Sequence, residues 1–320
     1  MGLRIANIAL AVPPLVETAA DLAPRMSKTA EWIEKNTGVL RRRVASPDLQ
    51  TPDLAAEAAR FALGQNDPPD LILYASASPH QLLPDTSVFL QRALGLSGVA
   101  GYSIHASCLS FLVALQTADA LLAAGAYRRI LICSAELASR ARNWQEPESA
   151  SLLGDGAAAA VVEWEESDCG LREFVLQTWP EGAELTEVRG VGLRKHPNDP
   201  DTRPEDQLFH MDGQAAYRMT RPRAKKMIEG VLRKANLTLD QIDLVIPHQA
   251  SGPGLRLLEK LGIAPQKIVN IIADYGNCVA ASIPMALAEA VRRNRIQPGD
   301  RLLLLGSAAG LSLGAAVLQW

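Results

Sequence analysis

The stretch HASCLSFLVALQTADALLAAG, residues 105–125, decides the fold. Cys108 stands where a strand-like run stops, and a long helical run of small and apolar side chains follows it. Such a composition is typical of a helix that protein covers on most sides. Gln116 and Asp119 interrupt the run, so we interpret it as a buried helix of a soluble protein and not as a membrane span.

The bulk composition excludes several classes of protein. The chain has 320 residues and 48% of them are apolar, which fits one large domain or two of ordinary size and argues against disorder. The formal net charge of -3 gives no sign of nucleic-acid or anionic-membrane binding. The four cysteines lack CxxC spacing, so they indicate neither a zinc site nor a disulfide scaffold and fit a reducing cytoplasm.

Strand patterns and helix patterns alternate along the chain. The first apolar stretch is broken by Pro13 and Pro14, and we interpret it as a strand and loop, not as a signal peptide. Buried strands interleaved with helices argue for an α/β architecture with helices on both sheet faces. The predicted strands are 70–77, 128–137, 156–164, 242–250, 267–276, 300–310 and 313–320, and the predicted helices are 52–64, 108–124, 214–235, 253–262 and 279–294.

The two halves of the chain follow a similar pattern. In the first half, a helix that starts near Cys108 leads into the strand ILICSAEL and then into GAAAAVVEW. In the second half, a helix that starts near Asn277 leads into LLLLGSAAG and then into GAAVLQW. We interpret this as an internal duplication, with an N-terminal half at 1–165 and a C-terminal half at 166–320.

The position of Cys108 makes it a candidate nucleophile. The N-terminus of a helix carries a partial positive charge, which favours the thiolate over the thiol. The alternative is a structural cysteine, because a free cysteine packs like a small hydrophobic residue. We interpret Cys133 and Cys169 as structural and Cys278 as a small residue at the start of a helix.

Other candidate groups lie at predicted strand ends, where the catalytic groups of α/β sheets gather. His248 ends the apolar strand LVIPHQAS, with a structural histidine as the alternative. Asn277 follows Gly276 and would offer a neutral amide donor to a carbonyl or an enolate, with a helix cap as the alternative. The small-residue turn at 306–314 would offer backbone N–H groups to an oxyanion, although such residues also serve close strand crossings.

The order of Cys108, His248 and Asn277 in a duplicated chain resembles the thiolase-fold condensing enzymes, and most closely the type III ketoacyl-acyl-carrier-protein synthases. The likeness extends over nearly the whole chain. The segments IPHQAS and YGNCVAASIPMAL resemble the family's PHQAN and GNTSAASIPLAL motifs. Further segments that resemble family motifs are TAEWIEKNTGVLRRRVA (29–45), LGDGAAAAVVE (153–163) and HMDGQAAY (210–217).

The resemblance implies a five-layered αβαβα fold of two similar halves, assembled as a homodimer. It implies that Cys108 accepts an acyl group from a thioester, with the backbone N–H groups of Cys108 and Ala309 as the oxyanion hole. His248 and Asn277 would then stabilise the enolate that forms when malonyl-acyl carrier protein loses carbon dioxide. No metal or redox cofactor would be required, because the substrates are thioesters of coenzyme A or of the carrier's phosphopantetheine.

The resemblance also assigns Trp32, Asn36 and Ser251 to coenzyme A or pantetheine binding. Trp32 matches the family tryptophan that stacks on adenine, with plain packing as the alternative. Asn36 replaces a family arginine, and the segment 143–151 has no arginine where the family has a second one. We therefore expect a weakened grip on coenzyme A, so that acyl-coenzyme A and acyl carrier protein both stay open as donors.

The resemblance suggests two further contacts. A basic run would dock the acidic acyl carrier protein, with a solvated helix face as the alternative. Leu83, in the loop at 78–87, would limit the acyl channel of the partner subunit where the family often has phenylalanine. The residues predicted to dock the carrier are Arg218, Arg221, Arg223, Lys225 and Lys226.

Two other functions stay open beside condensation. One is transfer of the acyl group from Cys108 to an alcohol or amine, and the other is a non-catalytic subunit of a paired synthase. Asn277 favours condensation, because simple transfer has less need of an enolate stabiliser. The sequence does not determine the length of the acyl group. It also leaves two pathways open, fatty-acid biosynthesis and polyketide or other secondary metabolism.

Overall fold

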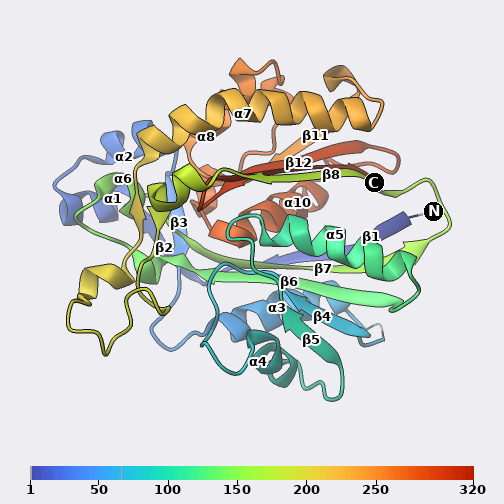
Figure 1. Cartoon of the computed structure of the whole chain (residues 1–320), viewed down its shortest axis with the longest axis horizontal. Coiled ribbons are helices and arrows are strands. Elements are labelled where there is room, and N and C mark those ends of the chain that lie inside the picture. Colours follow the sequence, from blue (N-terminus) through green and yellow to red (C-terminus); the bar gives the residue numbers. More distant parts are fainter. Residues whose placement is uncertain (1, 66) are drawn as a thin grey trace.

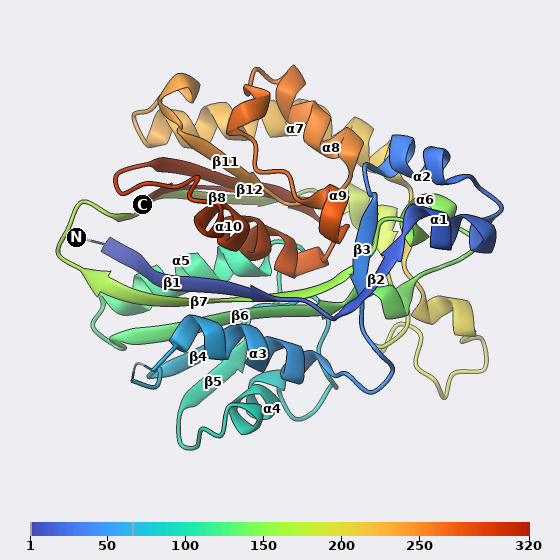
Figure 2. The same cartoon turned by 180° about the vertical axis from the view of Figure 1, so that it is seen from behind.

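Five layers of helix and sheet build the molecule (Figure 1). The computed structural model describes residues 2–65 and 67–320. Two β-sheets lie nearly parallel to each other, with helices on the outer face of each sheet and helices between them, and Figure 2 shows the same order from behind. The predicted αβαβα architecture is confirmed.

The first sheet belongs to the N-terminal half. Its strand order is β1-β7-β6-β4-β5, with β7 antiparallel to both β1 and β6, and with β6, β4 and β5 parallel. The helices α3 and α4 cover its outer face, and α5 covers its inner face. The bounds are β1 (Gly2–Ala11), β4 (Leu71–Tyr74), β5 (Ala100–Ser103), β6 (Arg129–Leu137), β7 (Asp155–Glu165), α3 (Thr51–Leu63), α4 (Thr86–Ala93) and α5 (Ser110–Ala123).

The second sheet belongs to the C-terminal half. Its order is β11-β12-β13-β8, parallel at the first pairing and antiparallel at the next two. The helices α7 and α8 cover its outer face and α10 its inner face. The bounds are β8 (Gly170–Thr178), β11 (Leu244–Pro247), β12 (Arg301–Ala308), β13 (Ser312–Gln319), α7 (Gly213–Lys234), α8 (Gly252–Lys260) and α10 (Ser282–Arg292).

The pairing pattern repeats between the halves. The order β4-β6-β7-β1 has one parallel and two antiparallel pairings, and β11-β12-β13-β8 has the same sequence of pairings. Each half also sends a buried helix, α5 or α10, into the space between the sheets. The predicted boundary at 165/166 falls in the connection between β7 and β8.

Shorter elements frame one end of the sheets. They include the hairpin of β2 and β3 and the two-residue ladder of β9 and β10. Their bounds are β2 (Leu15–Thr18), β3 (Arg41–Val44), β9 (Thr186–Glu187), β10 (His210–Met211), α1 (Ala19–Leu22), α2 (Ala30–Thr37), α6 (Pro147–Ala150) and α9 (Ile272–Tyr275), and the 3-10 turns are Ala23–Met26, Ala138–Ala141, Pro180–Leu185, Pro204–Gln207, Leu239–Gln241, Pro265–Lys267 and Val279–Ala281.

The largest core lies between the two sheets. Phe111 and Leu115 of α5 and Met285 of α10 are almost fully buried there. The alanines of β7 at 157–160 are also fully buried, and their short side chains let helices pack closely on both faces of the strand. None of the helices among the described residues is long and apolar enough to cross a membrane.

The strand predicted at 267–276 is wrong. Only Ile268 forms an isolated bridge, to Val245, and the chain then turns into α9. The Asn270 side chain accepts from the Ile272 N–H at 3.1 Å, in the turn that leads into this short helix. Gly276 ends it with φ +69, and a Cβ there would lie 2.5 Å from the Leu152 carbonyl oxygen, so the chain turns at a residue that only glycine suits.

Candidate active site

A tight turn between β5 and α5 presents Cys108. Ser107 has φ +50, and the helix begins only at Ser110, two residues after the cysteine. The Ser110 hydroxyl accepts from the Ala106 N–H at 3.0 Å and donates to the Ser107 carbonyl at 2.7 Å. His105 Nε2 lies 3.1 Å from the Ala77 carbonyl oxygen. These contacts fix the turn that carries the thiol.

The prediction of a favoured thiolate is wrong for this structure. Burial, with a smaller contribution from the charge of Glu136, raises the pKa of the Cys108 thiol to about 12. Backbone N–H groups of Ala309 and Cys108 hydrogen-bond the sulfur and lower this pKa, but they do not outweigh burial. Cys108 is therefore a neutral thiol at pH 7 before a substrate binds.

His248 lies directly after β11. Its backbone N–H donates to the Leu305 carbonyl at 2.8 Å, which continues the ladder to β12. Burial lowers the pKa of its imidazole to about 4, so the ring is neutral at pH 7. Gln249 braces this position, because its Nε2 donates to the carbonyls of Pro247 and Val269 and its Oε1 accepts from the Ile271 N–H.

Asn277 is held by both its backbone and its side chain. Its N–H donates to the Leu152 carbonyl at 2.8 Å, and its carbonyl accepts from the Gly154 N–H at 3.1 Å. Its Oδ1 accepts from the Val279 N–H at 2.8 Å, and its Nδ2 donates to the Ala250 carbonyl at 3.2 Å. The carboxamide is therefore fixed with its N–H groups toward the segment that follows His248.

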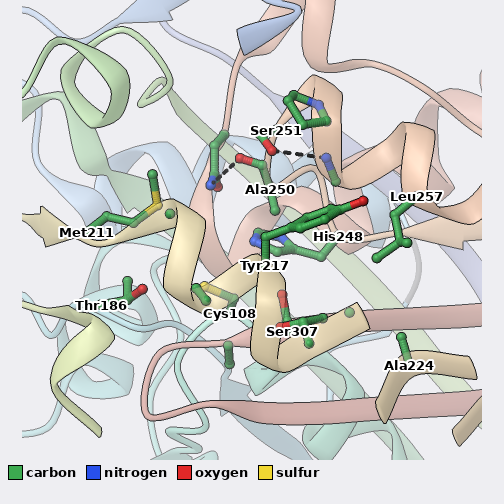
Figure 3. A pocket seen from close by; sticks show the side chains of 18 of the residues that line it. Cys108, Thr186, Met211, Tyr217, Ala224, His248, Ala250, Ser251, Leu257 and Ser307 are labelled. Atoms are coloured by element: carbon green, nitrogen blue, oxygen red, sulfur yellow. Dashed lines mark hydrogen bonds between the residues drawn. The ribbon is translucent and has the colours of Figure 1, made fainter. Parts of the chain in front are cut away.

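One cavity of about 630 Å³ brings the predicted catalytic residues together. Cys108, His248, Asn277 and Ala309 all line it. Figure 3 shows the thiol of Cys108 and the imidazole of His248 in this cavity, with Tyr217 of α7, which also lines it, in front of the imidazole in this view. The Ala309 N–H points at the sulfur, in the position expected of an oxyanion-hole donor.

Two of the three residues predicted to bind coenzyme A line the cavity. Asn36 and Ser251 line the cavity, whereas Trp32 is not one of the described residues that line it. Lys28 Nζ lies 4.8 Å from the centre of the Trp32 ring, so a cation covers the ring that was expected to stack on adenine. The Ser251 hydroxyl caps α8 by accepting from the Gly254 N–H at 3.1 Å.

The predicted basic run divides over two sides of α7. Arg218, Arg221 and Lys225 line one surface pocket together with Lys260 of α8. Arg223 lies elsewhere: its guanidinium is 3.0 Å from Glu181 and 5.1 Å from the centre of the Trp179 ring. Lys226 is exposed and does not line that pocket.

Leu83 does not line the cavity of its own subunit. Its side chain is 83% exposed, in the loop before α4. A role in an acyl channel therefore requires a second copy of the chain.

Sequence reasoning missed several residues of this region. Glu136, at the end of β6, is fully buried, and its Oε1 accepts from the Ala77 N–H at 2.6 Å. Burial raises the pKa of Glu136 to about 8. The sequence feature that could have indicated it is the charged Glu136 within the otherwise apolar strand ILICSAEL. Glu148 and Tyr217 also line the cavity: Tyr217 ends the motif-like segment HMDGQAAY, whereas no sequence pattern pointed to Glu148.

Solved structures with the same fold include 3-oxoacyl-[acyl-carrier-protein] synthases III. The Aquifex aeolicus enzyme matches with a TM-score of 0.91 and 30% identity over 100% of both chains. The Thermus thermophilus enzyme matches with a TM-score of 0.88 and 34% identity over 99% of this chain and 98% of that one. These matches identify the class of protein as thiolase-fold enzymes.

Sequence comparison identifies the family within that class. The family model described as 3-oxoacyl-[acyl-carrier-protein (ACP)] synthase III matches residues 102–180, and the model of its C terminal part matches residues 232–320. A beta-ketoacyl-[acyl-carrier-protein] synthase III of Nostoc sp. is 34% identical over 327 residues, covering 100% of this chain and 98% of the relative. The chain belongs to the 3-oxoacyl-[acyl-carrier-protein] synthase III family.

Proposed function

We propose that this protein is an acyltransferase of the beta-ketoacyl-acyl-carrier-protein synthase III type, which joins an acyl group to a malonyl unit on acyl carrier protein. The observation that carries the proposal is the convergence of Cys108, His248 and Asn277 in one cavity. The sequence relatives, which bear this enzyme's name and cover the whole chain, support it.

In the first step, the Cys108 sulfur attacks the carbonyl carbon of an acyl thioester. The thiol proton leaves, the bond to the pantetheine sulfur breaks, and the released pantetheine thiol takes up a proton. The backbone N–H groups of Cys108 and Ala309 hold the oxyanion of the tetrahedral intermediate. The neutral thiol gives up its proton only as the attack proceeds, since its pKa is raised by burial.

In the second step, a malonyl thioester loses carbon dioxide and the resulting enolate attacks the acyl-cysteine carbonyl. Its carbon–carbon bond forms as the bond to the Cys108 sulfur breaks, and the thiolate regains a proton. His248 and Asn277 donate hydrogen bonds to the thioester carbonyl on which the enolate charge develops. Neutral donors suit this step because they stabilise the enolate oxygen by hydrogen bonds without protonating it.

The mouth of the cavity favours an acyl carrier protein as the donor. Glu148 lines the cavity, and its carboxylate would repel the phosphates of coenzyme A. Asn36 donates its Nδ2 to the Trp32 carbonyl at 2.8 Å and carries no charge for a phosphate. The pocket of Arg218, Arg221, Lys225 and Lys260 suits the acidic surface of a carrier protein.

The remaining assignments complete the proposal. The enzyme works without a resident metal or redox cofactor, in the cytoplasm, in fatty-acid or secondary metabolism, and as a homodimer. Exposed apolar residues near β5 support the dimer: Leu82 and Leu83 are 65% and 83% exposed in the loop before α4, and Asp85 of the same loop accepts from the N–H of Ser103 in β5, which has an unpaired edge.

Intact mass spectrometry tests the proposal. The protein is incubated with acetyl, butyryl and octanoyl thioesters of coenzyme A and of acyl carrier protein, and then with malonyl-acyl carrier protein. We expect the acyl mass on Cys108, faster from the carrier than from coenzyme A, and then its loss as a 3-oxoacyl carrier product. Asn277→Ala should keep the acylation and lower the condensation rate by roughly a hundredfold or more.

The controls separate the alternatives. Cys108→Ala should remove the acyl mass, and Glu148→Lys should raise the rate from coenzyme A thioesters more than from carrier thioesters. An acyl ester or amide as the product would favour simple transfer, and no acylation with any donor would favour a non-catalytic subunit.

A further inference from the structure

The cavity extends well beyond the catalytic residues, beneath α7. Figure 3 shows Cys108 and Thr186 on one side of His248 and Leu257 and Ala224 on the other. We call the part beyond His248 the α7 arm. It is lined by Ala224, Met227, Ile228, Leu257, Leu305 and Leu313.

The lining of the α7 arm is entirely aliphatic apart from one thioether. Ala224, Met227 and Ile228 are spaced i, i+3 and i+4 and therefore share one face of α7. Leu257 comes from α8, and Leu305 and Leu313 come from β12 and β13 below. Apart from the weakly accepting sulfur of Met227, none of these side chains offers a hydrogen bond to water or to a polar ligand, so the arm suits an apolar group.

The cavity as a whole, of which the α7 arm forms one end, is longer than a short acyl group needs. The residues of α7 that line the cavity run from Gly213 to Ile228. At 1.5 Å of rise per residue, this corresponds to about 22 Å along the helix. The arm is continuous with the site of Cys108, so its occupant is a group that a thioester substrate carries.

We infer that the α7 arm binds the unbranched alkyl chain of a thioester substrate, and that its lining sets the chain length that this enzyme accepts. The inference rests on the proposed function for the identity of the substrate. The chain belongs either to the acyl donor or to the second thioester, and both have the same alkyl chemistry. Unlike the channel predicted at Leu83, this arm is complete within one subunit.

Binding of S-alkyl pantetheine thioethers tests the arm without any reaction at Cys108. Calorimetry with the S-butyl, S-octyl and S-dodecyl compounds should show tighter binding as the chain grows, by up to about fourfold per methylene that enters the arm. Ala224→Phe fills the arm and should cancel this gain for the two longer chains, by tenfold or more, with S-butyl binding unchanged. Ala224→Ser, which keeps the space open, is the matched control.

Acylation of Cys108 by butyryl, octanoyl and dodecanoyl carrier thioesters identifies the source of the chain. If Ala224→Phe blocks acylation by the longer donors, the chain is the donor's. If acylation is unchanged and only condensation with an alkylmalonyl carrier thioester is lost, the chain belongs to the second substrate.

Some outcomes would overturn the inference. One is an affinity that does not change with chain length in the unmodified protein, and another is an undiminished gain in folded Ala224→Phe. Should Ala224→Phe not fold, Met227→Ala enlarges the arm and must tighten S-dodecyl binding relative to S-butyl, or the inference fails. Length-dependent binding without any acylation of Cys108 would refute the proposed function alone.

Discussion

At the residue scale, the pKa values of three ionisable residues at and beside the cavity are shifted in the same sense. Burial raises the pKa of Cys108 to about 12 and that of Glu136 to about 8, and it lowers the pKa of His248 to about 4. Each shift favours the neutral form. At pH 7 these three groups are therefore uncharged before a substrate binds.

Replacing Glu136 should make Cys108 more reactive, but only at high pH. The carboxylate charge raises the pKa of the Cys108 thiol, and Glu136 ionises near pH 8. Glu136→Gln should therefore match the unmodified protein below about pH 7 and react several-fold faster above pH 8. The measurement is the rate at which iodoacetamide alkylates Cys108 between pH 6 and 10.

Glu289→Gln on α10, which removes another buried carboxylate, is the control and should leave the alkylation rates unchanged. The stability of the fold offers an independent check. The folded-state pKa of Glu136 lies above its ordinary value, so its contribution to stability is full below about pH 4.5 and is lost as the pH rises to about 8. The melting temperature of Glu136→Gln should gain on that of the unmodified protein across this range, and a constant difference would contradict the shifted pKa.

The sequence located the reactive residues but not their ionisation. Cys108 and His248 were recognisable because each follows a strand, and Asn277 because its segment resembles a family motif, although a short helix and not a strand precedes it. The direction of the Cys108 pKa shift was predicted wrongly, because burial depends on segments such as 306–314 and β6 that are distant in sequence. For the same reason, the contact of Lys28 with Trp32 was not predictable from the pattern.

At the scale of the element, long periodic helices were predicted within a few residues. The predictions 52–64 and 214–235 correspond to Thr51–Leu63 and Gly213–Lys234. Strand β8 was missed, because most of its residues are only partly buried or exposed and it lacks an apolar run. The stretch 267–276 was wrongly predicted because its apolar residues pack as a bridge and a short helix, and a strand and a helix turn share the same short apolar signature.

The basic face of α7 gives a prediction about carrier docking. Arg221→Glu with Lys225→Glu should raise the KM for malonyl-acyl carrier protein about tenfold and leave the turnover of malonyl-pantetheine unchanged, because the two cations act on the carrier and not on the reacting atoms. Steady-state kinetics at two salt concentrations provide the test, and the effect should shrink as salt rises.

Lys234→Glu supplies the matched control, since this exposed lysine lies at the far end of the same helix and outside the basic pocket. It should have little effect on the KM for the carrier. An equal effect of the control and of the double variant would mean that net charge matters and the pocket does not.

At the scale of the whole molecule, the duplication explains why one cavity collects residues from both halves. Cys108 precedes α5 of the first half, whereas His248, Asn277 and Ala309 belong to the second. The inner helices α5 and α10 lie against each other's sheets, so each half is incomplete without the other. The similar sequence pattern of the two halves predicted the layers of the fold. It carried no information on the depth of the cavity, because the sizes of the side chains on α7 and α8 determine that depth.

The unpaired edge of the first sheet gives the last prediction, an assembly of two copies. All four residues of β5 are exposed, Tyr102 is 41% exposed, and Val88 on the neighbouring helix α4 and Leu83 in the loop before α4 are exposed as well. An exposed strand edge with apolar neighbours can pair with the same edge of another copy, and in a two-fold dimer each residue contributes twice.

We expect sedimentation velocity to give a dimer, and Leu83→Asp with Tyr102→Asp to give a monomer. With roughly 1.5–3 kcal/mol lost per buried apolar side chain, the dissociation constant should rise more than a hundredfold. Leu15→Asp on β2, which replaces an exposed leucine elsewhere, should remain dimeric. A monomeric unmodified protein would refute the dimer, whereas a dimer that survives the double substitution would place its interface on another surface.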